Sequence, residues 1–154
     1  MKQIGKILSR DHILLDLDVS SKKRVFEQVG LLMENTCGIA RSEVFDCLFA
    51  REKLGSTGLG QGVAIPHGRA HGLKEAAAIF IRLKVPISFD APDGKPVQSL
   101  FVLLVPEQAT DLHLQVLSEL AQLFSSRPLR EKILSAQNVD ELYQILLEWS
   151  NNHA

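Results

Sequence analysis

The chain has 154 residues, and its 17 Lys and Arg nearly balance its 18 Asp and Glu, giving a formal net charge of −1. This length predicts one domain, residues 1–154, that buries about 68–70% of the surface of the unfolded chain. No basic stripe is present, which argues against a nucleic-acid partner. The longest unbroken apolar run, residues 100–105, is too short to insert across a bilayer.

The two cysteines, Cys37 and Cys47, form no CxxC pair and no disulfide framework. We interpret them as buried thiols in a reducing compartment. The sequence therefore predicts a cytoplasmic protein.

The N-terminal third reads as a strand followed by two helices. Residues 13–17 are a short strand candidate, and Ser20 or Ser21 then offers an N-cap for a helix that ends before Gly38. Ser42 is expected to cap the next helix.

The middle third contains the predicted strands. A glycine-rich loop at 55–62 leads into the short apolar run 63–66, which His67 follows directly. Residues 78–85 alternate in a way that predicts a strand with one wet face. Residues 100–105 are apolar throughout, which predicts a central strand covered on both faces.

The C-terminal third is predicted to be helical. Thr110 is expected to cap a helix that runs to about residue 125, and Pro128 suits the first turn of another. Asn138 and Glu141 resemble a capping box at the start of the last helix. Helices before and after a mixed set of strands predict an α/β protein, a three-layer α/β/α sandwich with a mixed β-sheet flanked by helices.

His67 is the sharpest candidate for a functional residue. It follows a short predicted strand and lies between Pro66 and Gly68. Ligand sites of α/β sheets gather at the carboxyl ends of strands. Local context leaves an ordinary histidine in an exposed turn equally open.

Two further candidates lie on predicted helices. His113 falls in line with Leu117 and Leu120, so it points inward near a helix N-terminus, where anions are favoured. A core histidine bonded to a backbone carbonyl is the alternative. Arg51 continues the apolar stripe of its helix, so its forked donors either reach a phosphate or complement the helix C-terminus.

The glycine-rich loop can also offer donors to an anion, from backbone N–H groups such as that of Gly58 and from the hydroxyls of Ser56 and Thr57. No GK[ST] follows the loop, and the next predicted element is a strand rather than a helix, so the loop is neither a P-loop nor a dinucleotide fingerprint.

The spacing of the histidines does not favour a metal site. His67 and His71 are four residues apart, but the glycines beside them disfavour a helix, and no acidic or cysteine ligand lies close in sequence. His12 and His153 are expected at the surface.

One long segment carries a family resemblance: Arg51-Glu-Lys-Leu-Gly-Ser-Thr-Gly-Leu-Gly-Gln-Gly-Val-Ala-Ile-Pro-His-Gly68. It resembles the active-site segment of the fructose/mannitol-type IIA domains of the phosphoenolpyruvate-dependent phosphotransferase system. Stretches at 89–97, 103–106 and 140–145 are similar as well, and the likeness covers about residues 3–150. Within the family the chain is most similar to the nitrogen-type branch.

The resemblance implies that His67 accepts a phosphoryl group from an HPr-like phosphocarrier. It implies that Arg51 and His113 are active-site residues, and that Ser56 and Thr57 belong to the active-site loop. Transfer in this family runs between histidines without a nucleotide, so no cofactor is expected. The downstream partners are either regulatory target proteins, which the nitrogen-type likeness favours, or a sugar-specific IIB domain.

Overall fold

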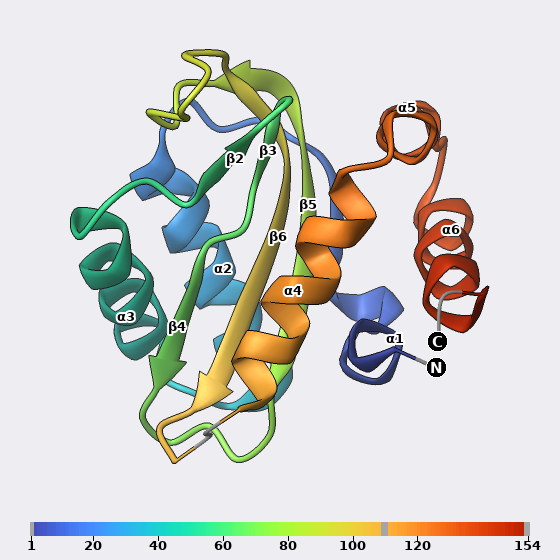
Figure 1. Cartoon of the computed structure of the whole chain (residues 1–154). Coiled ribbons are helices and arrows are strands. Elements are labelled where there is room, and N and C mark those ends of the chain that lie inside the picture. Colours follow the sequence, from blue (N-terminus) through green and yellow to red (C-terminus); the bar gives the residue numbers. More distant parts are fainter. Residues whose placement is uncertain (1, 109–110, 153–154) are drawn as a thin grey trace.

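The computed structural model describes residues 2–108 and 111–152, which form the predicted three-layer α/β/α sandwich (Figure 1). The strands are β1 (Ile13–Leu17), β2 (Gly58–Gly60), β3 (Val63–Ala64), β4 (His67–Ala70), β5 (Ala77–Ile87) and β6 (Val97–Pro106). The helices are α1 (Gln3–Ile7), α2 (Lys22–Cys37), α3 (Arg41–Lys53), α4 (Leu112–Phe124), α5 (Arg127–Ser135) and α6 (Val139–Asn152), with a 3-10 turn at Arg10–His12.

The mixed sheet has the order β1-β5-β6-β3-β2, and β4 also pairs with β6. The central pair, β5 and β6, is antiparallel, whereas β1 runs parallel to β5, and β3 and β4 run parallel to β6. Helices α2 and α3 cover one face, and α1, α4, α5 and α6 lie over the other (Figure 1).

The apolar run at 100–105 is the central strand that the sequence predicts. Leu100, Val102 and Leu104 pack into the core under α2 and α3. Phe101 and Leu103, with the opposite side-chain direction, pack under α4 and α6. Strand β6 is therefore buried on both faces because each face of the sheet carries its own helical layer.

The prediction of a wet face for 78–85 is wrong. Phe80 is fully buried in the core between the sheet and helices α4 and α6, and Arg82 is only 6% exposed. The Arg82 guanidinium donates to the backbone carbonyls of Ile133 and Ala136, at 3.0 and 2.6 Å, and its Nη2 lies 3.3 Å from Asp16 Oδ1. The alternation predicted a polar face in contact with water, but Arg82 instead donates hydrogen bonds to buried carbonyls at the end of α5.

Most predicted helix ends are confirmed, and one is wrong. Ser21 accepts the Arg24 N–H at the start of α2, and Gly38 ends that helix with φ 71°. Ser42 is the second residue of α3 rather than its N-cap, because α3 begins at Arg41. A carboxylate from the preceding helix, that of Glu34, accepts the Arg41 N–H instead.

In the C-terminal part, Pro128 lies in the first turn of α5, and Asn138 Oδ1 accepts the Glu141 N–H at 2.8 Å, as predicted. The expected cap at Thr110 lies outside the described residues, as does His153.

Two surface and burial expectations also need correction. His12 is 8% exposed, with its Nε2 2.9 Å from Thr36 Oγ1, so the expected surface position is wrong. Cys37 is exposed and Cys47 is half-buried, so neither is the fully buried thiol expected. Within residues 2–108 and 111–152, no helix has the length and apolar character needed to cross a membrane.

The buried guanidinium makes a stability prediction. Arg82→Met removes the donors of two buried carbonyls, and we expect the free energy of unfolding to fall by about 1–3 kcal/mol. Chemical denaturation followed by circular dichroism measures this change. The matched control is Asp16→Asn, which removes a partner whose side chain is 64% exposed, so the loss should stay at about 0–1 kcal/mol. Equal losses in the two variants would contradict this account.

Candidate active site

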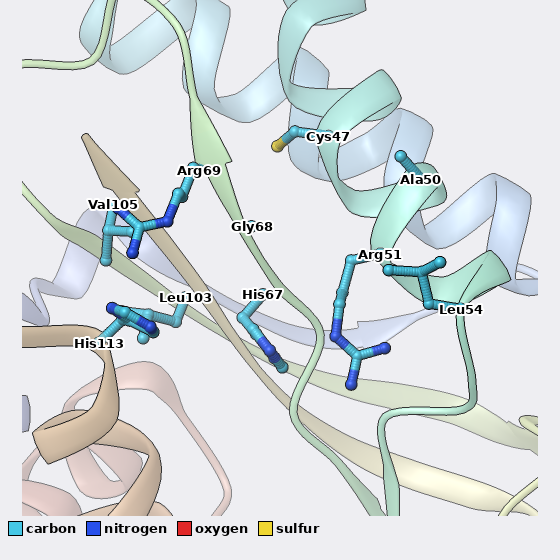
Figure 2. A pocket seen from close by; sticks show the side chains of 10 residues that line it. All are labelled: Cys47, Ala50, Arg51, Leu54, His67, Gly68, Arg69, Leu103, Val105 and His113. Atoms are coloured by element: carbon cyan, nitrogen blue, oxygen red, sulfur yellow. The ribbon is translucent and has the colours of Figure 1, made fainter. Parts of the chain in front are cut away.

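A cavity of about 410 Å³ opens where β4 lies between the C-terminal half of α3 and the N-terminus of α4. Figure 2 shows its side chains around His67. The lining residues are Cys47, Ala50, Arg51, Leu54, His67, Gly68, Arg69, Leu103, Val105 and His113. The three predicted residues His67, Arg51 and His113 are thus brought together from β4, α3 and α4.

His67 opens strand β4 rather than following a strand formed by 63–66, as expected, because β3 ends at Ala64. Side chains alternate along a strand, so His67 and Arg69 share one face, and Gly68 and Ala70 share the other. A Cβ at Gly68 would lie 3.0 Å from Cys47 Sγ and 3.2 Å from the Cys47 carbonyl oxygen. Glycine fits this position because it lets β4 lie directly against α3 without these tight contacts.

A backbone hydrogen bond orients the imidazole of His67. Its Nδ1 lies 2.9 Å from the carbonyl oxygen of Ile65. A carbonyl only accepts, so Nδ1 carries the proton, and in the neutral ring Nε2 then holds the lone pair. The sequence alone left this choice of nitrogen open.

The surroundings of His67 favour the neutral ring. Burial is the main cause that lowers the pKa of His67 below 6.5, and the positive charge of Arg51 adds to it, while the hydrogen bond to Ile65 opposes it. Neutral imidazole is the nucleophilic form. By contrast, burial raises the pKa of the nearby Cys47 thiol to about 12. This thiol therefore stays protonated and is a poor nucleophile.

Arg51 combines the two interpretations that the sequence left open. Its Nη1 donates to the Gly55 carbonyl at 2.9 Å, just beyond the end of α3, and its side chain also lines the cavity. The guanidinium is therefore held in place beside His67 (Figure 2).

His113 lies in the first turn of α4, with Leu120 on the same buried side. Its Nδ1 is buried and has no hydrogen-bond partner among the described residues. The alternative of a core histidine bonded to a backbone carbonyl therefore has no support at this atom, whereas the ring does line the cavity.

The donors of the glycine-rich segment are already engaged. The backbone N–H and the hydroxyl of Thr57 both donate to Glu52, the Ser56 hydroxyl donates to the Phe89 carbonyl, and the Gly58 N–H donates to Ser56 Oγ. None of Ser56, Thr57 and Gly58 lines the cavity. Their predicted role in binding phosphate would require these bonds to open.

The expected loop at 55–62 is also partly a hairpin. Strand β2 pairs antiparallel with β3. Gln61 and Gly62 turn between them with φ 58° and 78°, as in a type I′ turn.

Glu52 is an active-site neighbour that the sequence reasoning missed. It is 9% exposed and pairs with Lys22 at 3.0 Å, and its carboxylate holds Thr57. Its signal was present, because Val44, Leu48 and Glu52 are four residues apart and share one face of α3. An acid in the apolar stripe of a helix indicates a buried, paired carboxylate.

Arg69 was missed for a different reason. It stands two residues after His67, and this spacing places both side chains on one face only if they share a strand. Because His67 was expected after the end of a strand, the relation was not visible. Its neighbour His71 is exposed, and its Nδ1 lies 2.7 Å from Glu107 Oε1, which raises the pKa of His71.

Comparisons with known proteins show the family of the chain. Residues 6–149 match the family described as "Phosphoenolpyruvate-dependent sugar phosphotransferase system, EIIA 2". A nitrogen regulatory protein of Pseudomonas aeruginosa is 41% identical over 152 residues, covering 98% of this chain and 99% of that protein. A fructose-specific EIIA component of Haloferax volcanii is 36% identical over 108 residues, 70% of each chain.

A crystal structure of the nitrogen regulatory protein IIA-Ntr from Neisseria meningitidis superposes with a TM-score of 0.88 at 57% identity. The match covers 93% of this chain and 98% of that one. The chain belongs to the EIIA type-2 family of the phosphoenolpyruvate-dependent phosphotransferase system. Its similarity to nitrogen regulatory proteins extends over nearly the whole chain.

The electrostatics of the two histidines on either side of Arg69 predict opposite titrations. We expect the imidazole of His67 to titrate below pH 6.5, because burial disfavours its cation, and that of His71 to titrate above it, because Glu107 favours the cation. As pH falls, the unfolded chain protonates first at His67, so this residue opposes folding in acid. Imidazole carbon–proton shifts in NMR, assigned with His67→Ala and His71→Ala, measure both midpoints. A reversed order would contradict the burial of His67.

Proposed function

We propose that residues 1–154 form one cytoplasmic EIIA type-2 domain that accepts a phosphoryl group on His67 Nε2 from an HPr-like phosphocarrier. The observation that carries this proposal is the bond between His67 Nδ1 and the Ile65 carbonyl inside a cavity shared with Arg51 and His113. That bond sets the tautomer in which Nε2 is the nucleophile.

The transfer needs no external base. Nε2 of His67 attacks the phosphorus of the carrier's phosphohistidine, a new N–P bond forms, and the carrier's N–P bond breaks with its electron pair returning to the leaving imidazole. The His67 ring keeps its proton on Nδ1 and becomes a cation. The carbonyl of Ile65, 2.9 Å away, stabilises the charge that develops on this ring.

Positive groups around the transferred phosphoryl group are expected to lower the barrier further. In phosphoryl transfer the negative charge spreads over the equatorial oxygens, so positioned cations and donors lower the barrier. Arg51 is anchored by Gly55 beside His67, and His113 lies at the N-terminus of α4, where the helix dipole favours an anion. The pair Lys22–Glu52 fixes the loop that follows Arg51.

We propose further that the chain acts mainly as a nitrogen-type regulator, whose phosphorylation state determines the target proteins that it contacts. Relatives named nitrogen regulatory proteins match it along nearly their whole length. The alternative is a IIA protein that passes phosphate to a sugar-specific IIB domain, for which the fructose-specific component of Haloferax volcanii is the support.

His67→Ala tests the acceptor. We expect complete loss of phosphate incorporation from phosphoenolpyruvate, enzyme I and the HPr-like carrier, because His67 supplies the attacking Nε2. Mass spectrometry and an acid-lability assay measure the phosphate. His71→Ala is the matched control and should be phosphorylated like the original chain. An acid-labile phosphate on His67→Ala would overturn the assignment.

Partner capture separates the two downstream roles. We expect the phosphorylated and unphosphorylated forms to retain different regulatory proteins, since phosphate adds charge at the docking face. His67→Ala, fixed in the unphosphorylated state, should match the unphosphorylated chain. Recovery of a sugar permease component alone would favour the alternative.

A further inference from the structure

We propose that Arg69 is a second phosphoryl-binding residue, which approaches the group on His67 from the side opposite Arg51. This inference rests on the proposed phosphorylation of His67. In Figure 2 the guanidinium of Arg51 lies on one side of His67, and that of Arg69 lies on the other, toward His113. Both arginines line the cavity.

The backbone determines that Arg69 faces the cavity. Residues two apart in a strand are about 7 Å apart and point the same way, so Arg69 and His67 share a face of β4. The pairing of His67 with Leu103 and of Arg69 with Val105 in β6 fixes this register. Leu103 and Val105 line the same cavity, which confirms the shared face.

Neighbouring contacts hold the Arg69 side chain at the rim of the cavity. Its Nη1 donates to the backbone carbonyl of Glu107 at 2.9 Å, in the segment between β6 and α4. The carboxylate of Glu107 pairs with His71 instead, at 2.7 Å, and the His71 N–H donates to Glu43 at 3.0 Å. The bond from Arg69 to Glu107 is therefore made to the backbone carbonyl, and the side chain of Glu107 is paired with His71.

A phosphoryl group is a stronger partner than a carbonyl. Charge-assisted bonds from a guanidinium to phosphate oxygens are roughly twice as strong as neutral ones, and the planar fork of a guanidinium suits bidentate binding of phosphate. Arg69 is exposed in the isolated chain. A carrier docked over the cavity would exclude water from this guanidinium, so its charge would act at lower dielectric during transfer.

The test is single-turnover transfer from the phosphorylated carrier, measured over a range of carrier concentrations. We expect Arg69→Gln to lower the maximal transfer rate about tenfold or more, with the half-saturating concentration changed less than threefold. Arg69→Lys keeps the charge but loses the fork, so it should recover part of the rate. Arg127→Gln, which removes a surface guanidinium that is 81% exposed and does not line the cavity, should transfer normally.

A second measurement needs no turnover. Inorganic phosphate titrated into the unphosphorylated chain should shift the imidazole signals of His67, and Arg69→Gln should weaken this binding at least threefold. A rise in the half-saturating concentration alone would make Arg69 a carrier-docking residue and overturn the proposal, as would a maximal rate within twofold of the original chain. If His67→Ala still accepted phosphate, the failure would lie in the proposed function instead.

Discussion

Gly68 lets β4 lie so close to α3 that a Cβ there would come within 3.0 Å of the sulfur and 3.2 Å of the carbonyl oxygen of Cys47, so α3 would have to shift. Strand β4 is only four residues long and is hydrogen-bonded to β6 along its length. Its contact with α3 brings Arg51 beside His67, and its register with β6 directs His67 and Arg69 into one cavity. The cavity is lined by α3, β4, β6 and α4, which are far apart in the sequence. The close approach at Gly68 determines how α3 and β4 meet, and therefore where Arg51 lies relative to His67.

Within that frame, one carbonyl and one buried carboxylate organise the chemistry. The carbonyl of Ile65 accepts a hydrogen bond from the Nδ1–H of His67, which leaves the lone pair of the neutral ring on Nε2. The carboxylate of Glu52 is paired with Lys22 and holds Thr57. Glu52 does not line the cavity, and the lining among the described residues is basic or apolar. Such a lining favours an incoming dianion over water.

Several elements could be predicted because their signals are local. The run 100–105 indicated a strand covered on both faces, Ser21 and Gly38 marked the ends of α2, and the spacing of His113 placed it on the inner side of α4. Other predictions failed where tertiary contacts changed the meaning of a pattern. Arg82 occupies a position that alternation assigns to water, yet carbonyls at the end of α5 receive its donors.

The sequence by itself determined the α/β class and most helix ends, because periodicity and capping residues act over a few neighbouring residues. It also determined the family resemblance, because the motif from Arg51 to Gly68 is continuous in the chain. The tertiary structure decided which of these residues meet, which nitrogen of His67 keeps the proton, and which donors of the glycine-rich segment are already engaged. It also brought Arg69 to the site. These outcomes depend on strand register and on contacts between distant elements, and no local pattern records either.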